Sequence, residues 1–561
     1  MQRSAAAAAV YIQKSTGQTG RSGQAYRSRL TLGLRLFPAC ALATALMMPM
    51  AAPCQNANQK PDPNQNVKLP IVTTTVEVHG EVRNDYLSSG ATAASLDGAA
   101  LKETPLSVMT ISGAVLSDQI ARTLADVVKN DASVNEDYAP VGYYGDFQIR
   151  GFPIDLATGL QINGMTIAGE QDVPLENKER VEIVKGIAGV ESGIAAAGGL
   201  INYVTKEPRA GLRPAIDLAT DDRGTAYGAL DAGRVLTTAL QPGVRLNIAA
   251  ESMHPYVQHA DGWRGMGAAD AEFHLTPGTN LFADFEYQHK VQRSVAGYQL
   301  LGGTTIPSPV FPSTMLGYQS WSKPNTFDVF NAGARLQHTF NAKWSAQLNG
   351  SYSHSLIDDN VIWPYGPALD ANGNSLCPNA PAFFFCPDGS YEIYDYRSPG
   401  ELRINAVGDA LAIGRVTTGA FTHNIVAGGS IFHRSVNLSS STVYTPLGVE
   451  NVYQPNRSYA PEVPYEQAGP SALADFNHQV AGLIQDRVHI PGGFSVLAGG
   501  RYLRVTDFNY TSARSLWLPQ YAATYSPTRA ITFYGNYGVL MSLGPQAPWW
   551  VDNSSEFLEP F

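Results

Sequence analysis

The sequence has 561 residues, enough for two or more domains, because a single hydrophobic core rarely extends that far. Only 15% of the residues are charged, whereas glycine (53) and tyrosine (27) are abundant. This composition is typical of strands with one apolar and one polar face rather than of a cytosolic enzyme. The net charge of −10 argues against nucleic acid as a partner and weakly favours a cationic or metal-bearing ligand.

Residues 1–52 have the pattern of a signal peptide. A stretch with four arginines precedes the apolar run Leu36–Ala52, which has small residues near its end. The run is short and contains Pro38 and Pro49, so it is a poor transmembrane helix. The alternative is a disordered basic tail followed by a core helix. No later stretch is apolar enough to cross a membrane as a helix, so an exported chain is either soluble or a barrel.

Residues 53–80 are expected to form a flexible linker that ends in a short strand. Pro53–Pro70 is polar and proline-rich, so no core can form there. A strand that follows a flexible tether can add to the sheet edge of another chain. The alternative is that it is the first strand of the next domain. The strand is predicted at Ile71, Val72, Thr73, Thr74, Thr75, Val76, Glu77 and Val78.

Residues 81–209 have the pattern of a compact mixed α/β domain. Apolar residues recur at helical spacing and predict a helix over Ser117–Lys129, with Ser117 as its N-cap. Glycine-rich turns separate the short strands that surround this helix. These strands are predicted at Leu106–Ile111, Phe147–Arg150, Gly159–Ile162, Val181–Val184 and Leu200–Thr205.

Residues 210–561 alternate apolar and polar side chains over long strands. The clearest examples are Val244–Ala250, Leu281–Tyr287, Trp344–Tyr352 and Ile531–Tyr537. Such strands, with aromatic residues near their ends, predict a transmembrane antiparallel β-barrel. A soluble β-sandwich is the alternative, disfavoured by the small neutral residues on the polar faces. The segment Asp358–Glu392 is expected to be a long extracellular loop.

Two cysteines lie nine residues apart in that predicted loop. Cys377 and Cys386 would form a loop disulfide in an exported protein, which would stabilise the fold by about 2–3 kcal/mol at most. A metal site is the less favoured alternative, because no histidine is near in sequence.

Several motifs in order resemble those of TonB-dependent receptors, nearest to the siderophore-receptor branch. The resemblance covers almost the whole of residues 81–209 and one hairpin of the later strands. It implies a mostly β fold, in which an N-terminal mixed α/β plug domain lies inside a transmembrane antiparallel β-barrel of 22 strands in the family. The motifs are Lys102–Ser112, Thr123–Val134, Phe147–Phe152, Ile162–Met165, Glu179–Pro208 and Leu518–Gly538.

The resemblance also implies a function. The receptors of this family are monomers of the bacterial outer membrane, and they import ligands with energy from a TonB-type protein that captures the TonB box, here Ile71–Val78. The ligand is expected to be an iron–siderophore complex, with no intrinsic cofactor, no metal site and no catalytic site. The alternatives are a passive porin or surface-binding barrel, and a non-functional truncated fragment.

The family assigns roles to individual residues of the plug and the loops. Arg150 and Arg180 are expected to pair with barrel carboxylates and to anchor the plug, the alternative being bonds to plug carbonyls. Glycines of the plug allow tight turns: Gly151, Gly186, Gly198 and Gly199. Ligand contacts are expected from aromatic residues, the alternative being ordinary girdle or loop aromatics: Tyr138, Tyr143, Tyr144, Trp363 and Tyr365.

The C-terminal residues do not resemble the closing strand of a barrel. The roughly 350 residues after the plug suffice for about 14 to 17 strands. Phe561 is aromatic, but Pro560 cannot donate to a strand ladder and Glu559 occupies an expected apolar site. We expect a partial barrel and a longer reading frame, because an unclosed barrel exposes unsatisfied backbone groups to lipid.

Overall fold

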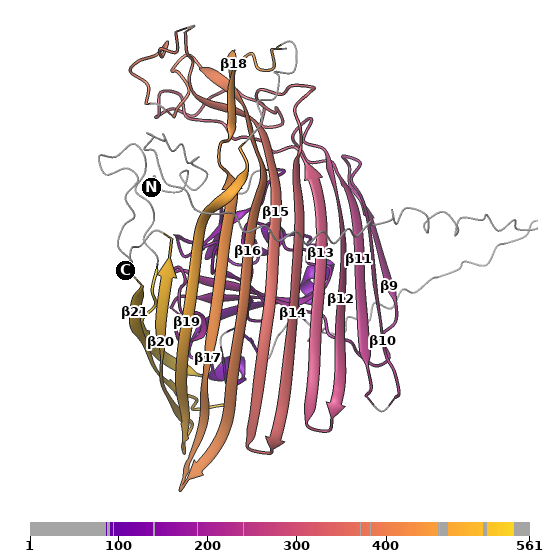
Figure 1. The fold of residues 1–561 in the computed structure, drawn as a ribbon, viewed down its shortest axis with the longest axis vertical. Coiled ribbons are helices and arrows are strands. Elements are labelled where there is room, and N and C mark those ends of the chain that lie inside the picture. The colour runs from indigo at the N-terminus through magenta and orange to yellow at the C-terminus, as the bar shows by residue number, and fades with distance from the viewer. Residues whose placement is uncertain are drawn as a thin grey trace, which may run out of the picture. The chain divides into compact units, whose positions relative to one another are not determined.

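Figure 1 shows the computed structural model of the chain. It describes residues 86, 90–93, 95–138, 141–187, 189–238, 240–370, 372–381, 383–457, 459, 469–508 and 513–542. The predicted signal peptide, linker, TonB box and C-terminal residues lie outside the described residues, and those assignments stay predictions.

The first part of the chain forms two small sheets. A five-stranded sheet has the order β1-β7-β8-β5-β6, and a three-stranded sheet has the order β2-β3-β4. Their buried side chains form one core that includes Ile149, Val181, Ile183 and Ile201. The strands are β1 (Ser107–Ser112), β2 (Val134–Tyr138), β3 (Asp146–Ile149), β4 (Phe152–Pro153), β5 (Leu160–Ile162), β6 (Met165–Thr166), β7 (Lys178–Lys185) and β8 (Gly199–Thr205).

The helices of this part are short, and the predicted helix over Ser117–Lys129 is wrong. The chain forms α1 (Gly113–Asp118) and α2 (Leu124–Val128) instead, because Ile120 adopts a left-handed conformation with φ of 52°. The backbone N–H of Thr123 then donates to Asp126 at 3.1 Å, which starts α2 as a new helix. The remaining helices are the 3₁₀ turn η2 (Leu101–Glu103) and α3 (Gly189–Ser192).

The second part of the chain forms one curved antiparallel sheet (Figure 1). Neighbouring strands pair in chain order, except that β18 pairs with β16 and β19 pairs with β17. The strands are β9 (Ala215–Thr220), β10 (Ala226–Val235), β11 (Gly243–Met253), β12 (Gly262–Thr276), β13 (Thr279–Gln292), β14 (Asn325–Asn341), β15 (Trp344–Pro367), β16 (Ser390–Thr418), β17 (Phe421–Ser439), β18 (Val443–Asn451), β19 (Ser471–Ile490), β20 (Phe494–Asp507), β21 (Arg514–Tyr525) and β22 (Phe533–Gly538).

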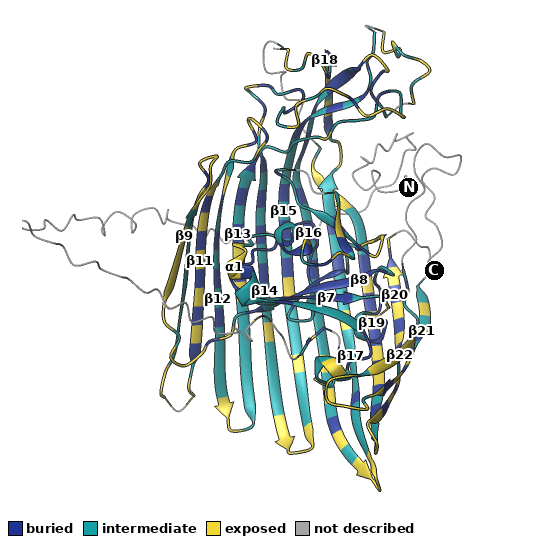
Figure 2. Cartoon of the chain, turned by 180° about the vertical axis from the view of Figure 1, so that it is seen from behind, coloured by how far each residue is buried: buried dark blue, intermediate teal, exposed yellow. Residues whose placement is uncertain are grey.

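The alternation predicted from the sequence decides which side chains face the first domain. On β11, Val244, Leu246 and Ile248 are exposed, whereas Arg245 and Asn247 between them are buried. The same stripes recur on the other long strands (Figure 2). The apolar residues therefore form the outer face of the sheet, and the polar residues face the plug, as in a membrane barrel.

The two ends of the strands carry different connections. At one end the chain turns within residues 277–278, 342–343, 419–420 and 491–493. At the other end the connections span 293–324, 368–389 and 440–470. Outer-membrane barrels have short periplasmic turns and long extracellular loops, so the long connections mark the extracellular end.

The sheet is open within the part of the chain that the structure describes. The edge strands β9 and β22 each pair with one neighbour, β10 and β21 respectively. Side chains at both edges are exposed, including Leu218 and Phe533.

The predicted loop Asp358–Glu392 is shorter than expected, because both of its ends are strand. β15 continues to Pro367 and β16 starts at Ser390, so the connection is confined to residues 368–389. The register shifts by one residue within this extension, because Ile357 pairs with Glu401 but Asp359 pairs with Ser398. This β-bulge contains Gly400, which has φ of 72° and donates its N–H to Asp358 at 2.7 Å.

Candidate functional site

One segment of the plug, Ile167–Lys178, contacts the inner face of the sheet along several strands. The backbone N–H of Ala168 donates to Ser353 of β15 at 3.0 Å, and Asn405 of β16 donates to the carbonyl of Ile167 at 2.7 Å. Ser355 of β15 donates to the carbonyl of Glu170 at 2.7 Å. We call Ile167–Lys178 the wall segment. Its buried backbone groups would otherwise lack hydrogen-bond partners, and they find these partners on the barrel wall.

The wall segment also makes ion pairs in which the plug supplies most of the acids. Glu170 pairs with Arg434 of β17 at 2.7 Å and with Arg403 of β16 at 3.6 Å. Glu176 pairs with Arg264 of β12 at 2.6 Å. The remaining pairs join Asp172 to Lys290 and Lys178 to Glu286, both on β13. Most of these side chains are buried, so each charge depends on its partner.

The predicted anchors, Arg150 and Arg180, do not make these contacts. Arg180 pairs with Glu182 of the plug itself at 2.8 Å. Arg150 is exposed in a left-handed turn with φ of 54°, and it forms no ion pair with another described residue. Its guanidinium lies beside Gly186 of the plug.

The predicted plug glycines occupy turns or close contacts. Gly151 and Gly186 have positive φ angles of 83° and 91°. Gly199 has φ of 125°, and a side chain there would meet the carbonyl oxygen of Val184. Gly198 has an ordinary φ, but a Cβ atom would lie 2.6 Å from the carbonyl oxygen of Ile149. Glycine is therefore required sterically at the two last positions.

The apical tyrosines of the plug meet the upper wall of the barrel. The Tyr143 hydroxyl donates to Asp359 of β15 at 3.0 Å, and its ring lies 5.6 Å from that of Phe327. Tyr144 packs beside it at a ring distance of 4.5 Å. Burial and the charge of Asp359 raise the pKa of Tyr138 to about 12, so this side chain lies near the same carboxylate. All three predicted plug residues thus gather at the extracellular end of the plug.

The parts of β15 and β16 that extend beyond the β-bulge at Gly400 carry further aromatic side chains. Trp363 pairs with Tyr394, and Tyr396 pairs with Tyr444, in the register of β15, β16 and β18. Tyr394 stacks on Tyr444 at 4.2 Å, and Trp363 lies 6.2 Å from Tyr365. Residues two apart on a strand share a face, so these rings lie on the face that carries Asp359. We call this set the aromatic face: Trp363, Tyr365, Tyr394, Tyr396 and Tyr444.

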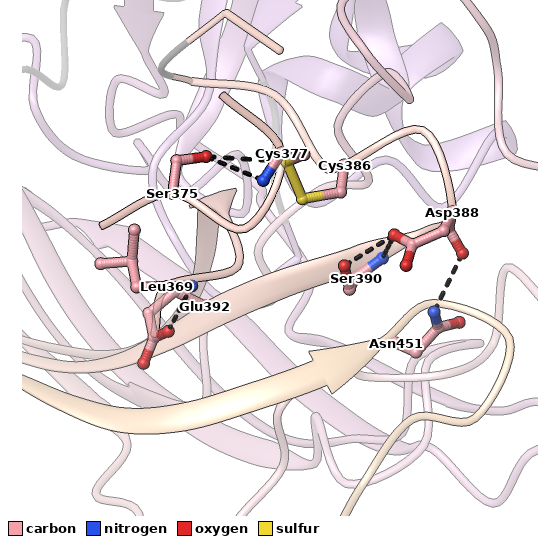
Figure 3. Close-up of a disulfide and its surroundings, with 8 residues drawn as sticks. All are labelled: Leu369, Ser375, Cys377, Cys386, Asp388, Ser390, Glu392 and Asn451. Carbon is pink, nitrogen blue, oxygen red and sulfur yellow. Dashed lines mark hydrogen bonds between the residues drawn. A yellow bond between two sulfur atoms is a disulfide. The ribbon is translucent and has the colours of Figure 1, made fainter. Parts of the chain in front are cut away.

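The extracellular connections that support the aromatic face have a core of their own. Leu301, Leu316, Phe385 and Ile393 belong to one buried cluster that joins two long connections to β15 and β16. A disulfide between Cys377 and Cys386 closes the connection at residues 368–389 (Figure 3). Asn451 of β18 donates to the carbonyl of Asp388 at 3.0 Å beside it. These loops are therefore packed rather than loose.

No metal centre or membrane-spanning helix is found in the described ranges. These residues contain no group of three or more histidine, cysteine or acidic side chains placed to hold a metal ion. No helix among them is long and apolar enough to cross a membrane.

Comparisons with known proteins agree with this architecture. The family described as TonB-dependent receptor plug domain matches residues 100–200, and the family described as TonB-dependent receptor-like β-barrel matches residues 262–548. The chain belongs to the TonB-dependent receptors. This confirms the predicted resemblance, the predicted fold of a plug with a barrel, and the outer-membrane location.

Related receptors are considerably longer than this chain. The ferrichrome receptor FcuA of Yersinia enterocolitica is 27% identical over 80% of this chain and 58% of its own length. The ferripyoverdine receptor of Pseudomonas aeruginosa is 22% identical over 82% of this chain and 55% of its own length. The chain therefore spans little more than half the length of both relatives.

Solved structures show the same fold. The pyoverdine receptor FpvA of Pseudomonas aeruginosa matches with a TM-score of 0.72 and 19% identity, over 86% of this chain and 68% of that one. The ferric preacinetobactin receptor BauA of Acinetobacter baumannii matches with a TM-score of 0.71 and 18% identity, over 85% and 70%.

The ion pairs of the wall segment predict how receptor variants behave. In Glu286→Gln, the buried side chain of Lys178 loses its carboxylate partner, so we expect a loss of about 3–5 kcal/mol in plug stability. Protease accessibility of the plug and cell sensitivity to large antibiotics would report the loosening. Arg150→Ala is the matched control and should change neither, because Arg150 is exposed; a larger effect from Arg150→Ala would contradict the assignment.

The acidic residues of the plug predict a stability maximum at mildly acidic pH. Burial raises the pKa of Glu191 in α3 to about 7, from 4.5. The folded plug therefore binds one more proton than the unfolded chain between about pH 4.5 and pH 7. The free energy of unfolding should rise by roughly 3 kcal/mol as the pH falls through this range. Burial alone would also raise the pKa of Glu170, but the charges of Arg434 and Arg403 hold it below 4.5. Its contribution is therefore fully present above pH 4.5 and is lost as pH falls further.

Urea unfolding of the receptor across pH tests this expectation. The unfolding midpoint should be highest near about pH 5. In Glu191→Gln the increase between pH 7 and pH 5 should be smaller than in the wild type, because burial also raises the pKa of Asp146 to about 6 and that contribution stays, while the loss below pH 4.5 remains. A profile for Glu191→Gln that matches the wild type would exclude Glu191 as the titrating group.

Proposed function

We propose that this receptor imports a ferric siderophore across the outer membrane, with energy delivered by a TonB-type protein through the TonB box at Ile71–Val78. The observation that carries the proposal is the aromatic face. It lies beyond the extracellular end of the plug, on the strands β15 and β16, where Tyr143 of the plug donates to Asp359. Aromatic side chains bind a bulky organic chelate with little loss of conformational entropy. The iron is cargo, and the receptor needs no cofactor and catalyses no reaction.

The names of related receptors support this ligand class. FcuA is a ferrichrome receptor, the Pseudomonas aeruginosa relative is a ferripyoverdine receptor, and Fiu of Escherichia coli is a catecholate siderophore receptor. These ligands differ in chemistry, but each is an iron chelate. The proposed domain order is a signal peptide at 1–52, a linker with the TonB box at 53–80, a plug at 81–209 and barrel strands at 210–561, in a monomer.

The plug explains why energy is needed. The outer membrane holds no ATP and sustains no ion gradient, so work must come mechanically from the inner membrane. The wall segment joins the plug to six consecutive barrel strands, β12 to β17, and buried ion pairs do not open without an input of energy. A pull on an extended N-terminal strand supplies that energy without a second ligand.

Deletion of residues 71–78 tests the energy coupling. We expect radioactive iron uptake from ferric siderophores to fall to background in iron-starved cells, while binding to chilled cells stays unchanged. Deletion of eight polar linker residues, 56–63, is the control of equal length and should preserve uptake. Uptake that persists without residues 71–78 would indicate a passive porin, and absence of binding and uptake for every chelate would overturn the proposal.

Substitution on the aromatic face tests the ligand site. Tyr444 stacks on Tyr394 and is partly exposed, so Tyr444→Ala should weaken chelate binding by about 1–2 kcal/mol, or roughly tenfold. Tyr453 lies two residues beyond the end of β18 and outside the aromatic face, so Tyr453→Ala is the matched control. Equal affinities of the two variants in equilibrium binding would exclude the aromatic face.

A further inference from the structure

The first plug segment of the described chain that contacts the barrel forms a closed loop. Residues 90–93 and 95–103, which we call the strap, run from a β-bridge between Gly90 and Ala100 into η2. The strap precedes every other described segment of the plug that bonds to the barrel wall. It also follows the proposed TonB box in chain order, so it lies between the point of pulling and the plug sheet.

The strap is bonded to the plug through the buried carboxylate of Glu182 and through Arg180, which donates to Thr92 Oγ1 at 3.1 Å. Glu182 of β7 is fully buried, and its two oxygens accept the backbone N–H groups of Thr92 at 2.9 Å and Ala93 at 3.0 Å. The small side chains of Ala91 and Ala93 pack against Val184 and Leu200 behind them. This attachment is made of short contacts over a few residues.

The strap is bonded to the barrel through one arginine. Arg487 of β19 donates from Nε to Asp97 Oδ2 at 2.7 Å and from Nη2 to Asp97 Oδ1 at 3.1 Å. Its Nη1 donates to the carbonyl of Glu103 at 2.6 Å. A single guanidinium thus joins two positions of the strap, in the bidentate geometry that arginine favours with a carboxylate.

Both side chains of this pair are excluded from water. Asp97 and Arg487 each have a side chain only 1% exposed. Burial alone would raise the pKa of Asp97, but the hydrogen bonds and charge of Arg487 hold it below 3.8. The pair is therefore ionised, and neither charge can leave its partner without a large penalty unless it reaches solvent.

The position of Arg487 connects this pair to the N-terminal pull. β19 runs from the long-connection end at Ser471 to the short turn after Ile490, so Arg487 lies close to the periplasmic end of the barrel. The wall segment is bonded to strands β12–β17, so the strap on β19 is a separate attachment. Force from the periplasm reaches the strap before it reaches the wall segment.

We propose that Arg487 is the positioning residue of a latch, the Asp97–Arg487 pair, which holds the strap against the barrel at rest and is the first plug–barrel contact that the TonB-type protein breaks. This inference rests on the proposed function for the identity of the pulling partner. The holding role at rest does not depend on transport, so it can be tested separately.

Thiol labelling of the strap tests the latch in cells. Ala91 is only 5% exposed and tolerates a small side chain, so Ala91→Cys in a background with Cys40 and Cys54 changed to serine is a probe of strap release. In cells without the TonB-type protein, the probe should be unlabelled in the wild-type receptor. Adding Asp97→Asn should increase its labelling rate by at least ~10-fold, because the buried guanidinium loses its charged partner.

Two further variants separate the latch from general loosening. Glu176→Gln breaks the ion pair with Arg264, in which both side chains are only 6% exposed. This variant should leave labelling of the strap unchanged. Arg487→Lys keeps the charge but loses the bidentate geometry, so its labelling rate should fall between those of the wild type and Asp97→Asn. Equal labelling in Asp97→Asn and Glu176→Gln would overturn the latch.

The energised cell tests the order of events. With the TonB-type protein and a ferric siderophore present, the wild-type probe should become labelled. If the receptor imports the ferric siderophore while the probe stays unlabelled, the latch is overturned and the proposed function stays intact. A receptor that carries no chelate, but whose probe is released by Asp97→Asn in cells without the TonB-type protein, would overturn the proposed function and leave the resting latch intact.

Discussion

The structure depends on the pairing of charges between the plug and the barrel wall. The wall has polar side chains on its inner face because its outer face must be apolar, and a plug that fills the lumen removes water from them. Each buried charge then requires a partner of opposite sign. The plug supplies acids such as Glu170 and Glu176, and the wall supplies arginines such as Arg434 and Arg264. The position of the plug follows from this pairing together with an apolar cluster in which Ile194 of the plug joins Leu503 and Leu518 of the wall.

The same pairing divides the plug into parts with different mechanical roles. The wall segment bonds through several side chains and backbone groups to consecutive strands, so no single substitution detaches it. The strap bonds to the barrel through one guanidinium at the periplasmic end. A load applied from the periplasm would meet a single strong contact first and a distributed set afterwards. Such an order favours stepwise release of the plug over simultaneous rupture of all contacts between the plug and the barrel wall.

The sequence predicted the fold well, because period-two alternation in strands such as Val244–Ala250 reports directly which side faces lipid. It predicted the site less well. Arg150 and Arg180 are in recognisable motifs, yet their side chains face solvent and Glu182. The density of charge in residues 168–178 was the available signal for the wall segment. The partners come from strands 88 to 264 residues away, as for Arg264 and Arg434, and only the register of the sheet brings them together.

Local geometry also overrode local patterns in two places. Helical spacing around Ile120 predicted one helix, but a left-handed residue divides it, and spacing alone does not report a single dihedral angle. The sequence pattern does not predict Tyr394, Tyr396 and Tyr444 as candidates, because only the register of β15, β16 and β18 places them on one face with Trp363. Trp363 and Tyr365 were selected from composition, and the paired register of β15 and β16 places the first beside Tyr394.

The β-bulge at Gly400 determines which residues of β16 lie on the aromatic face. Below the bulge the odd-numbered residues, such as Glu401 and Arg403, face the plug; above it the even-numbered residues, Tyr394 and Tyr396, lie on that face instead. A strand without the extra residue would present Asp395 and Arg397 there and would turn the tyrosines outward. One inserted amino acid thus exchanges a charged lining for an aromatic one without any change in the rings themselves. Selectivity in such a receptor can diverge through the length of a strand as readily as through its side chains.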